Sequence, residues 1–174
     1  VKEQLPELAD HQILREPVRR NTAPCITYAC DKIYTKDKDA TIIITPADHL
    51  VLNEDKFVAV IDKCIDFVSN NTFLVTLGVK PTKPATGYGY IQFEDEHSPD
   101  GFYRVKTFTE KPTLEIAKTF LKSGDFLWNS GMFVWKAKTI LEAIRKHLPE
   151  IGDAFKDGAN YYNTPDEQKF ISTA

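Results

Sequence analysis

The sequence lacks several features that would place it in a familiar class at once. It has no apolar run near the roughly 20 residues needed to cross a bilayer, and its N-terminal residues lack the basic-then-apolar order of a signal peptide. Its three cysteines are odd in number and form no CxxC pair, which favours buried free thiols over a disulfide framework. These absences predict no membrane association and a cytoplasmic location.

An excess of positive charge is also missing. The 22 Lys and Arg are outnumbered by 25 Asp and Glu, which gives a formal net charge of −3. Proteins that bind nucleic acids usually gather basic side chains into a stripe that meets the phosphates, so this balance argues against that class. A small anionic substrate stays compatible, because one lysine and a metal ion can hold a phosphate.

What the sequence does contain is typical of an α/β domain. The segment 40–45, ATIIIT, is a β-branched run without alternation and predicts a central parallel strand buried on both faces. Apolar residues at three- and four-residue spacing over 57–68 predict an amphipathic helix capped by Asn53, and 72–79 predicts the next buried strand. Strand, helix and strand of these lengths form a βαβ crossover.

The segments before this unit extend the α/β pattern. Asn21 and Thr22 are cap candidates for a helix that runs to about Tyr34, and Pro24 is tolerated in its first turn. The segment 12–17 predicts a short strand. A second βαβ unit could therefore precede the first.

Downstream the pattern alternates and is rich in aromatic residues. Segments 88–93 and 102–111 predict paired antiparallel strands, separated by the turn-forming residues 99–101. The segment 128–137 predicts another strand. The predicted result is a mixed sheet covered by helices.

Two further helices are predicted among these strands. The first begins at the cap Thr113 and stops at Gly124, and the second occupies 138–148. From Gly152 onward the sequence is polar and predicts irregular structure. The residues of the first helix expected to face inward are Leu114, Ala117 and Leu121.

One carboxylate stands where α/β sheets bind ligands. Asp48 follows the strand 40–45, and ligands of open α/β sheets bind beyond the carboxyl ends of the strands. Its oxygen atoms suit Mg²⁺, which often also holds substrate phosphates. A capping role in a strand-to-helix loop is the alternative interpretation.

Further polar groups stand at the ends of other strands. Gly89 either lets a ligand approach the backbone or forms a tight turn. Glu110 and Lys111 end a strand before Pro112, which predicts extended geometry at Lys111. This pair would serve a sugar phosphate, or it is a solvated surface pair. Asn129 suits a sugar pocket, with a locally bonded β-bulge as the alternative.

Five segments in a fixed order are more specific than any one of them. They are EPVRRNTAP, TPADH, LGVKPTKPATGYGYI, FTEKP and WNSGMF, between Glu16 and Phe133. In this order they closely resemble bacterial mannose-1-phosphate guanylyltransferases. The resemblance implies a Rossmann-like nucleotidyltransferase fold with a mixed, mostly parallel central sheet, flanking helices and an antiparallel sugar-binding layer. It also implies that GTP and mannose 1-phosphate react to give GDP-mannose and pyrophosphate, with Mg²⁺ as cofactor.

The resemblance also implies roles for residues of this sequence. Glu16, Asn21 and Thr22 would contact the nucleotide, and Asp48 would bind Mg²⁺. Asp48 and Lys111 would be the catalytic residues. The implied sugar-phosphate contacts are Gly89, Glu110, Lys111 and Asn129.

Two parts of that family pattern are absent from the 174 residues. Family members begin with a Gly-rich loop that bears an Arg and cradles the triphosphate, and they carry a second metal-binding Asp further along. The eight glycines of this sequence form no such loop, and no such Asp is reached. We therefore expect a single nucleotidyltransferase domain over 1–174 that is incomplete at both ends and inactive by itself.

Two other functions stay open on the sequence. A sugar-1-phosphate nucleotidyltransferase for another nucleotide or sugar would use Asp48 and Lys111 equally well. A non-catalytic domain that binds nucleotide sugars would account for the missing phosphate loop. Whether the protein forms a homo-oligomer also stays open.

Overall fold

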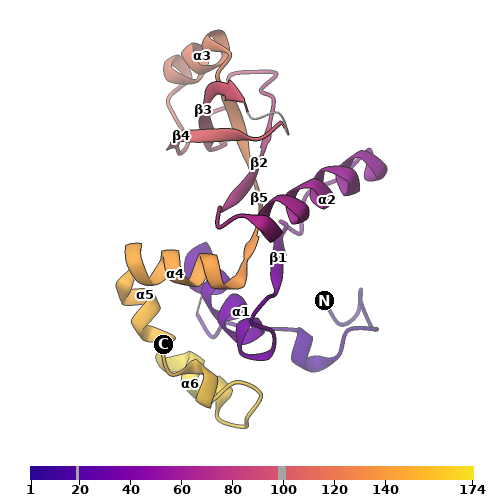
Figure 1. Cartoon of the computed structure of the whole chain (residues 1–174), viewed down its shortest axis with the longest axis vertical. Helices are drawn as coiled ribbons and strands as arrows, with labels where there is room; N and C mark the ends of the chain where they lie inside the picture. The colour runs from indigo at the N-terminus through magenta and orange to yellow at the C-terminus, as the bar shows by residue number, and fades with distance from the viewer. Residues whose placement is uncertain (19, 98–100) are drawn as a thin grey trace. The chain divides into compact units, whose positions relative to one another are not determined.

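The computed structural model describes residues 1–18, 20–97 and 101–174. Helices and strands both occur along these ranges, as expected for an α/β protein (Figure 1). None of the described helices has the length and apolar character that a bilayer crossing requires. The predicted turn residues Pro99 and Asp100 lie outside the described residues.

The chain divides into two compact units. The terminal unit comprises Val1–Ile42, Ile61–Leu74 and Trp135–Ala174. The central unit comprises Ile43–Val60 and Val75–Val134. Each unit has its own cluster of buried apolar side chains, one around Tyr28 and one around Tyr90.

Four strands form antiparallel ladders through residues of the central unit. β3 (Tyr90–His97) pairs with β4 (Tyr103–Thr109), which confirms the predicted antiparallel pair. β3 also pairs with β5 (Phe126–Lys136), and β2 (Val75–Val79) pairs with β5 farther along that strand. These ladders bring the chain just before β3, the end of β4 and the middle of β5 into register with one another.

β1 (Thr41–Ile44) completes a five-stranded sheet with the order β1, β5, β3, β4, in which β2 also pairs with β5. All three ladders whose register is described are antiparallel, so the prediction of a mostly parallel sheet is wrong for them. β1 is only partly buried, and Ile43 is 43% exposed, so it is not the strand buried on both faces that we predicted. A β-branched run predicts a strand but does not select its partners, because strand pairing is a non-local choice.

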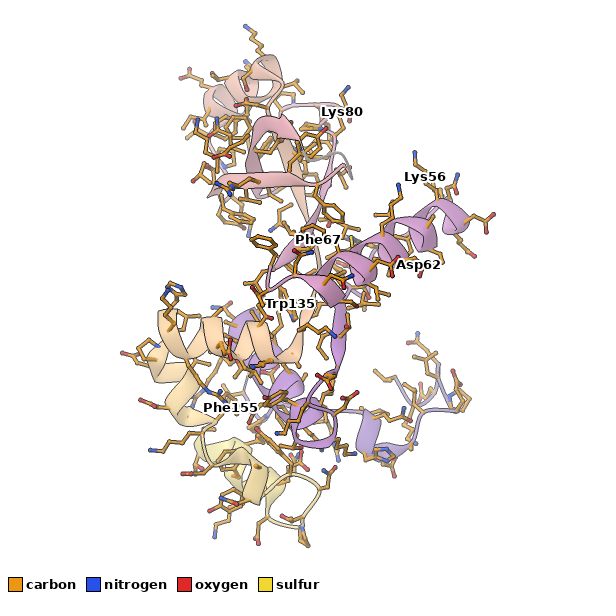
Figure 2. The ribbon with its side chains drawn as sticks, viewed as in Figure 1. Lys56, Asp62, Phe67, Lys80, Trp135 and Phe155 are labelled. Atoms are coloured by element: carbon orange, nitrogen blue, oxygen red, sulfur yellow. The ribbon has the colours of Figure 1, made fainter. Side chains whose placement is uncertain are left out.

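α2 (Glu54–Asn70) follows its prediction closely. The side chain of Asn53 accepts a hydrogen bond from the backbone N–H of Lys56 at 3.0 Å, so the predicted cap is confirmed. The side chain of Lys56 projects away from the helix into solvent (Figure 2). The buried residues recur at the predicted spacing, and they are Ile61, Cys64 and Val68.

α3 (Leu114–Ser123) begins and ends where the sequence predicts. The Thr113 side chain accepts a hydrogen bond from the backbone N–H of Ile116, and this confirms the N-cap. Gly124 has a φ of +83°, the left-handed conformation that glycine adopts most easily at a helix end.

The inward face of α3 differs from the predicted one. Ala117 is fully buried in the cluster with Tyr90, but Leu114 and Leu121 are 49% and 36% exposed. The rings of Phe120 and Phe126 stack at 3.8 Å between their centroids in the same cluster. These two aromatic rings fill the space beneath the helix that we had expected the leucines to fill.

The terminal unit is built mainly from helices. α1 (Thr22–Lys36) packs against α4 (Ala137–His147) and α5 (Pro149–Ala154), and α4 packs against α5 (Figure 1). The predictions of α1 and α4 are confirmed. The prediction of a strand over 12–17 is wrong, because the described residues there form no strand and follow a 3₁₀ turn, Asp10–Gln12.

The C-terminal segment is not the irregular tail that we predicted. A 3₁₀ turn, Gly158–Asn160, and α6 (Glu167–Thr173) follow α5. The prediction failed because the apolar residues of this segment are few and are scattered along the sequence. They join Tyr28 in one core cluster, whose buried members are Tyr28, Phe155, Tyr162 and Ile171.

Charged side chains are also buried in the terminal unit. Glu167 accepts hydrogen bonds from the Tyr28 hydroxyl, from Lys32 Nζ at 2.6 Å and from the backbone N–H of Asn163 at 2.7 Å. Burial acts to raise the pKa of the Glu167 carboxyl, but these hydrogen bonds together hold it below its usual value. A buried pair that is satisfied in this way fixes α1 against α6.

The cysteines are free, but they are not all buried as predicted. Cys30 and Cys64 are buried, whereas Cys25 is exposed. Burial raises the pKa of the Cys30 thiol to about 11, so this group is an unreactive part of the core.

Candidate functional site

Three of the residues assigned to the sugar phosphate meet in the central unit. Gly89 directly precedes β3, and its carbonyl oxygen accepts a hydrogen bond from the backbone N–H of Asn129 at 2.8 Å. A Cβ atom at position 89 would lie 2.6 Å from Glu110 Oε2 and 3.4 Å from Asn129 Cβ. The antiparallel ladders of β3 with β4 and β5 therefore bring Gly89, Glu110 and Asn129 together from separate parts of the chain.

Gly89 fits this place because it has no side chain. A separation of 2.6 Å is shorter than any van der Waals contact, so a side chain here would displace the Glu110 carboxylate. The absence of a Cβ lets Glu110 reach back over the loop that precedes β3. The group that approaches Gly89 closely is thus the Glu110 carboxylate, and the approach of a ligand to this backbone stays a prediction.

Lys111 does not have the extended backbone that Pro112 predicts. Its φ is +43°, in the left-handed region that residues other than glycine adopt rarely, and strain of this kind costs about 1–3 kcal/mol. Its backbone N–H donates to the carbonyl oxygen of Tyr88 at 3.2 Å, and this bond ties the turn to the loop before β3. The prediction of extended geometry is wrong because the tertiary hydrogen bond overrides the local preference.

The Glu110 and Lys111 side chains form an exposed ion pair. Lys111 Nζ lies 3.6 Å from Glu110 Oε1, and the two side chains are 66% and 69% exposed. An ion pair in this setting adds little to stability because water competes for both groups. Both charges therefore stay available to a ligand.

The two polar atoms of the Asn129 amide differ in their hydrogen bonding. Its Oδ1 accepts a hydrogen bond from the backbone N–H of Gly131 at 3.0 Å, which is the local bonding that we had considered as the alternative. Its Nδ2 lies 3.8 Å from the Cβ position of Gly89 and donates to no residue in the described part of the chain. The local bond holds the amide so that its N–H groups face the Gly89 loop.

The neighbouring Ser130 has a structural role. Its hydroxyl donates to the carbonyl oxygen of Leu77 at 2.6 Å and accepts from the backbone N–H of Met132 at 3.1 Å. The pairing of β2 with β5 shifts register between Thr76 and Gly78, close to this bond. Ser130 thus supports the irregular pairing from which Asn129 extends.

Asp48 lies in a turn after β1, near the same part of β5. A Cβ at Gly131, whose φ is +71°, would lie 3.3 Å from Cγ of Pro46, so the loop containing Asp48 packs on β5 beside Asn129. Asp48 is exposed, and within the described ranges its carboxylate makes no hydrogen bond or ion pair. It does not cap α2, because Asn53 does so.

An exposed carboxylate without a partner fits a magnesium ion. Mg²⁺ keeps several waters and is commonly held by one or two carboxylates together with substrate phosphates. Among the described residues no group of three or more His, Cys, Asp or Glu is arranged to hold a metal. Asp48 is therefore suited to hold Mg²⁺ together with a phosphate, and not as part of an all-protein cage.

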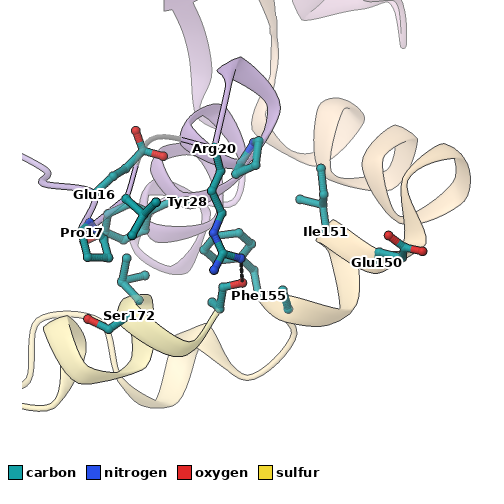
Figure 3. A pocket seen from close by; sticks show the side chains of 13 residues that line it. Glu16, Pro17, Arg20, Tyr28, Glu150, Ile151, Phe155 and Ser172 are labelled. Atoms are coloured by element: carbon teal, nitrogen blue, oxygen red, sulfur yellow. Dashed lines mark hydrogen bonds between the residues drawn. The ribbon is translucent and has the colours of Figure 1, made fainter.

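The three residues assigned to the nucleotide lie in the terminal unit. Glu16 lines a cavity of about 230 Å³ together with Arg20, Tyr28 and Phe155 (Figure 3). Asn21 and Thr22 do not line this cavity. Of the three residues, Glu16 is thus the one that lines this cavity.

Asn21 has an unusual backbone at the start of α1. It occupies the predicted N-cap position, but its side chain makes no capping hydrogen bond. Its φ and ψ are +70° and −173°, a combination that residues other than glycine seldom adopt. The first N–H groups of α1, including that of Thr22, thus lie at a helix start that the Asn21 side chain does not cap, and anions bind readily at such helix starts.

One further residue in each unit was not singled out from the sequence, Arg20 in the terminal unit and Tyr88 in the central unit. Arg20 lines the cavity and donates to the carbonyl oxygen of Ala174 at 3.1 Å (Figure 3). Tyr88 is 49% exposed, and its ring meets that of Trp128 edge-on with 5.1 Å between the centroids. Tyr88 could have been found from its place between Gly87 and Gly89, whereas no pattern in the sequence indicates the contact of Arg20.

Comparison with known proteins gives consistent matches over almost the whole chain. The sequence model of a family described as nucleotidyl transferase matches residues 1–169. A putative mannose-1-phosphate guanylyltransferase of Vibrio cholerae is 40% identical over 140 residues, which are 80% of this chain and 30% of that protein. The mannose-1-phosphate guanylyltransferase of Klebsiella pneumoniae is 38% identical over 167 residues, which are 92% of this chain and 35% of that protein. The chain thus spans about a third of these curated relatives.

Solved structures agree with this result. A crystal structure from Thermus thermophilus, described as mannose-1-phosphate geranyltransferase, superposes with a TM-score of 0.82 at 26% identity and covers 98% of this chain and 49% of that one. A structure from Helicobacter pylori, described as mannose-6-phosphate isomerase, has a TM-score of 0.70 at 39% identity and covers 83% of this chain and 53% of that one. The predicted α/β nucleotidyltransferase fold is confirmed.

Proposed function

Because the chain belongs to the nucleotidyl transferase family, we propose that its protein transfers a guanylyl group from GTP to mannose 1-phosphate. The products are GDP-mannose and pyrophosphate. The observation that carries this proposal is the convergence of Gly89, Glu110 and Asn129, beside which Lys111 presents its ammonium group. Relatives that are named for this reaction support the choice of nucleotide and sugar.

The central unit provides groups for both parts of the sugar phosphate. The Glu110 carboxylate accepts from sugar hydroxyls, and the open Nδ2 of Asn129 donates to a sugar oxygen. The Gly89 backbone contributes its N–H, and the absence of a side chain there lets Glu110 reach the same place. The Lys111 ammonium meets the phosphate, where a charge-assisted hydrogen bond is stronger than a neutral one.

The reaction that follows is an in-line transfer. A phosphate oxygen of mannose 1-phosphate forms a bond to the α-phosphorus of GTP, while the bond from that phosphorus to the bridging oxygen breaks. Pyrophosphate leaves with the electron pair of the broken bond. No covalent enzyme intermediate is needed, so the protein acts by positioning two anions that repel each other and by offsetting their charge.

Asp48 is the residue that would hold Mg²⁺. Bound Mg²⁺ supplies positive charge that offsets the charge of the phosphates. Asp48 contributes an exposed carboxylate. The packing of Pro46 near Gly131 supports this role, because it brings the loop that contains Asp48 close to Asn129.

The nucleotide contacts that we propose are Glu16, Asn21 and Thr22. We also propose the cytoplasm as the location of the reaction.

Product analysis on the complete natural protein tests this function. With Mg²⁺ and mannose 1-phosphate, GTP should give GDP-mannose faster than ATP, UTP, CTP or dTTP gives the corresponding product. With GTP held constant, the rate of product formation with mannose 1-phosphate should exceed the rate with glucose 1-phosphate. Faster turnover with another pair would assign a different sugar-1-phosphate nucleotidyltransferase, and binding of nucleotide sugars without turnover would assign a non-catalytic domain.

A further inference from the structure

Glu110 and Lys111 are consecutive residues, yet their charged groups lie on the same side of the chain. In an extended strand the side chains of neighbouring residues point to opposite faces. Here Lys111 Nζ is 3.6 Å from Glu110 Oε1, and Glu110 Oε2 reaches over Gly89. The positive φ of Lys111 is what breaks the alternation of the strand.

Pro112 restricts which conformation Lys111 can use for this turn. Lys111 lies between the end of β4 and the start of α3, and its backbone departs there from extended geometry. A following proline disfavours the right-handed helical region, because its Cδ collides with the preceding residue. Lys111 occupies the left-handed region, and the proline disfavours the right-handed region as its alternative.

Two contacts hold the turn in this state. The Lys111 N–H donates to Tyr88, as described above, and Pro112 is buried while Lys111 itself is exposed. The ion pair with Glu110 is too exposed to offset backbone strain by itself. The hydrogen bond to Tyr88 and the burial of Pro112 therefore hold the turn, and the ion pair adds little to it.

We propose that Pro112 is a positioning residue of the sugar-phosphate site, which directs Lys111 toward the ligand that Glu110 binds. By disfavouring the right-handed conformation at Lys111, it helps to keep the ammonium and the carboxylate on one side of the turn. A phosphorylated sugar can then meet both groups at once. This inference rests on the proposed function, since it assigns the pair to the sugar phosphate.

A double-mutant cycle in the complete natural protein tests the proposal. Pro112→Ala should raise the KM for mannose 1-phosphate about tenfold and leave the KM for GTP unchanged, because only Lys111 is redirected. In a Lys111→Met background, Pro112→Ala should change the KM by less than about twofold, since no ammonium remains to be positioned. An equal change in both backgrounds would overturn the proposal.

Pro149→Ala is the matched control for the loss of a proline. Pro149 occupies the first turn of α5 in the terminal unit, where a proline is tolerated but not required. Pro149→Ala should leave the KM for mannose 1-phosphate and the KM for GTP unchanged. A rise in the KM for mannose 1-phosphate in this variant equal to that in Pro112→Ala would contradict a specific role for Pro112.

A second pair of variants tests the backbone itself without depending on catalysis. Lys111→Gly should unfold at a higher temperature than Lys111→Ala, because glycine adopts a positive φ without strain. An equal or lower midpoint for Lys111→Gly would overturn the inference even if Pro112→Ala failed to fold. If the wild-type protein makes no GDP-mannose, the proposed function fails, and the glycine and alanine variants still decide whether the turn is strained.

Discussion

A Lys–Glu pair of the terminal unit, Lys32 with Glu167, differs in almost every physical respect from the pair of Lys111 with Glu110 in the central unit. Lys32 and Glu167 lie 2.6 Å apart with side chains 9% and 10% exposed, and Glu167 has two further hydrogen-bond donors. Glu110 and Lys111 lie 3.6 Å apart and are mostly exposed. The first pair is satisfied within the protein and stabilises it, whereas the second leaves its charges open to a ligand.

The same contrast holds for the backbones that carry the two pairs. Lys32 and Glu167 lie within regular helices, α1 and α6. Lys111 lies on a strained turn, and Glu110 reaches over a glycine that has no room for a side chain. Backbone strain and exposed charge occurring together indicate binding, because neither favours the folded state.

The largest expected effect concerns the buried pair. Glu167→Ala should lower the free energy of unfolding by about 3–5 kcal/mol, because it leaves the Lys32 ammonium buried without a partner. Urea denaturation of wild type and variant measures the difference. A loss below about 1 kcal/mol would mean that this pair is no more structural than an exposed one, and the comparison would fail.

Asp48→Asn should instead spare stability and remove turnover. An amide is a weaker magnesium ligand than a carboxylate, so we expect the rate in the complete natural protein to fall by about 10²- to 10³-fold. The midpoint of unfolding should not change, because Asp48 is exposed and makes no described bond. Asp62→Asn, at an exposed position on α2, is the matched control. Full activity of Asp48→Asn at ordinary Mg²⁺ concentrations would remove Asp48 from the site.

Lys111→Ala should separate the two substrates. Loss of a charge-assisted hydrogen bond of about 1.5–3 kcal/mol should raise the KM for mannose 1-phosphate by roughly 10- to 100-fold, with a much smaller change for GTP. Steady-state kinetics with each substrate varied in turn measure both values. Lys106→Ala, which removes an exposed lysine of β4, is the control. A rise confined to the KM for GTP would assign Lys111 to nucleotide binding instead.

The sequence predicted α1, α2, α3 and α4 because the signals of these helices are local, whereas it missed α6. The caps Asn53 and Thr113 and the stop Gly124 each act within one turn of the helix that they end, and all three occur as predicted. The order and direction of the strands could not be read in this way. β-branched runs indicate strands, but partners and register depend on residues far along the chain.

The candidate site shows the same division between local and distant causes. The residue types at Gly89, Glu110 and Asn129 could be chosen from the sequence, and the structure brings them together. The conformation of Lys111 could not be predicted from the sequence, because the hydrogen bond to Tyr88 overrides the local preference of a residue before proline. The buried cluster around Glu167 was missed because its members come from helices at opposite ends of the sequence.

The smallest expected effect is a pH dependence that divides the carboxylates of the terminal unit. Hydrogen bonds hold the pKa of Glu167 below its usual value, so its contribution to stability is present above that value and is lost as the pH falls through the folded-state pKa. Burial raises the pKa of Asp31, and the hydrogen bond from Tyr162 and the charge of Arg145 offset this only in part. The folded protein therefore takes up the Asp31 proton more readily than the unfolded chain does, and Asp31 favours folding more at acid pH than at neutral pH.

Removing each carboxylate should therefore change the acid limb of the stability curve in opposite directions. Between about pH 3 and pH 5, stability should fall less steeply with falling pH in Glu167→Gln than in wild type, and more steeply in Asp31→Asn. Urea denaturation at several pH values measures both slopes, and the exposed variant Glu110→Gln should leave the wild-type slope unchanged. If Glu110→Gln flattened the acid limb as much as Glu167→Gln did, the exposed pair would carry the same acid-sensitive stabilisation as the buried pair. The distinction between a pair that holds the fold and a pair that is open to a ligand would then be lost.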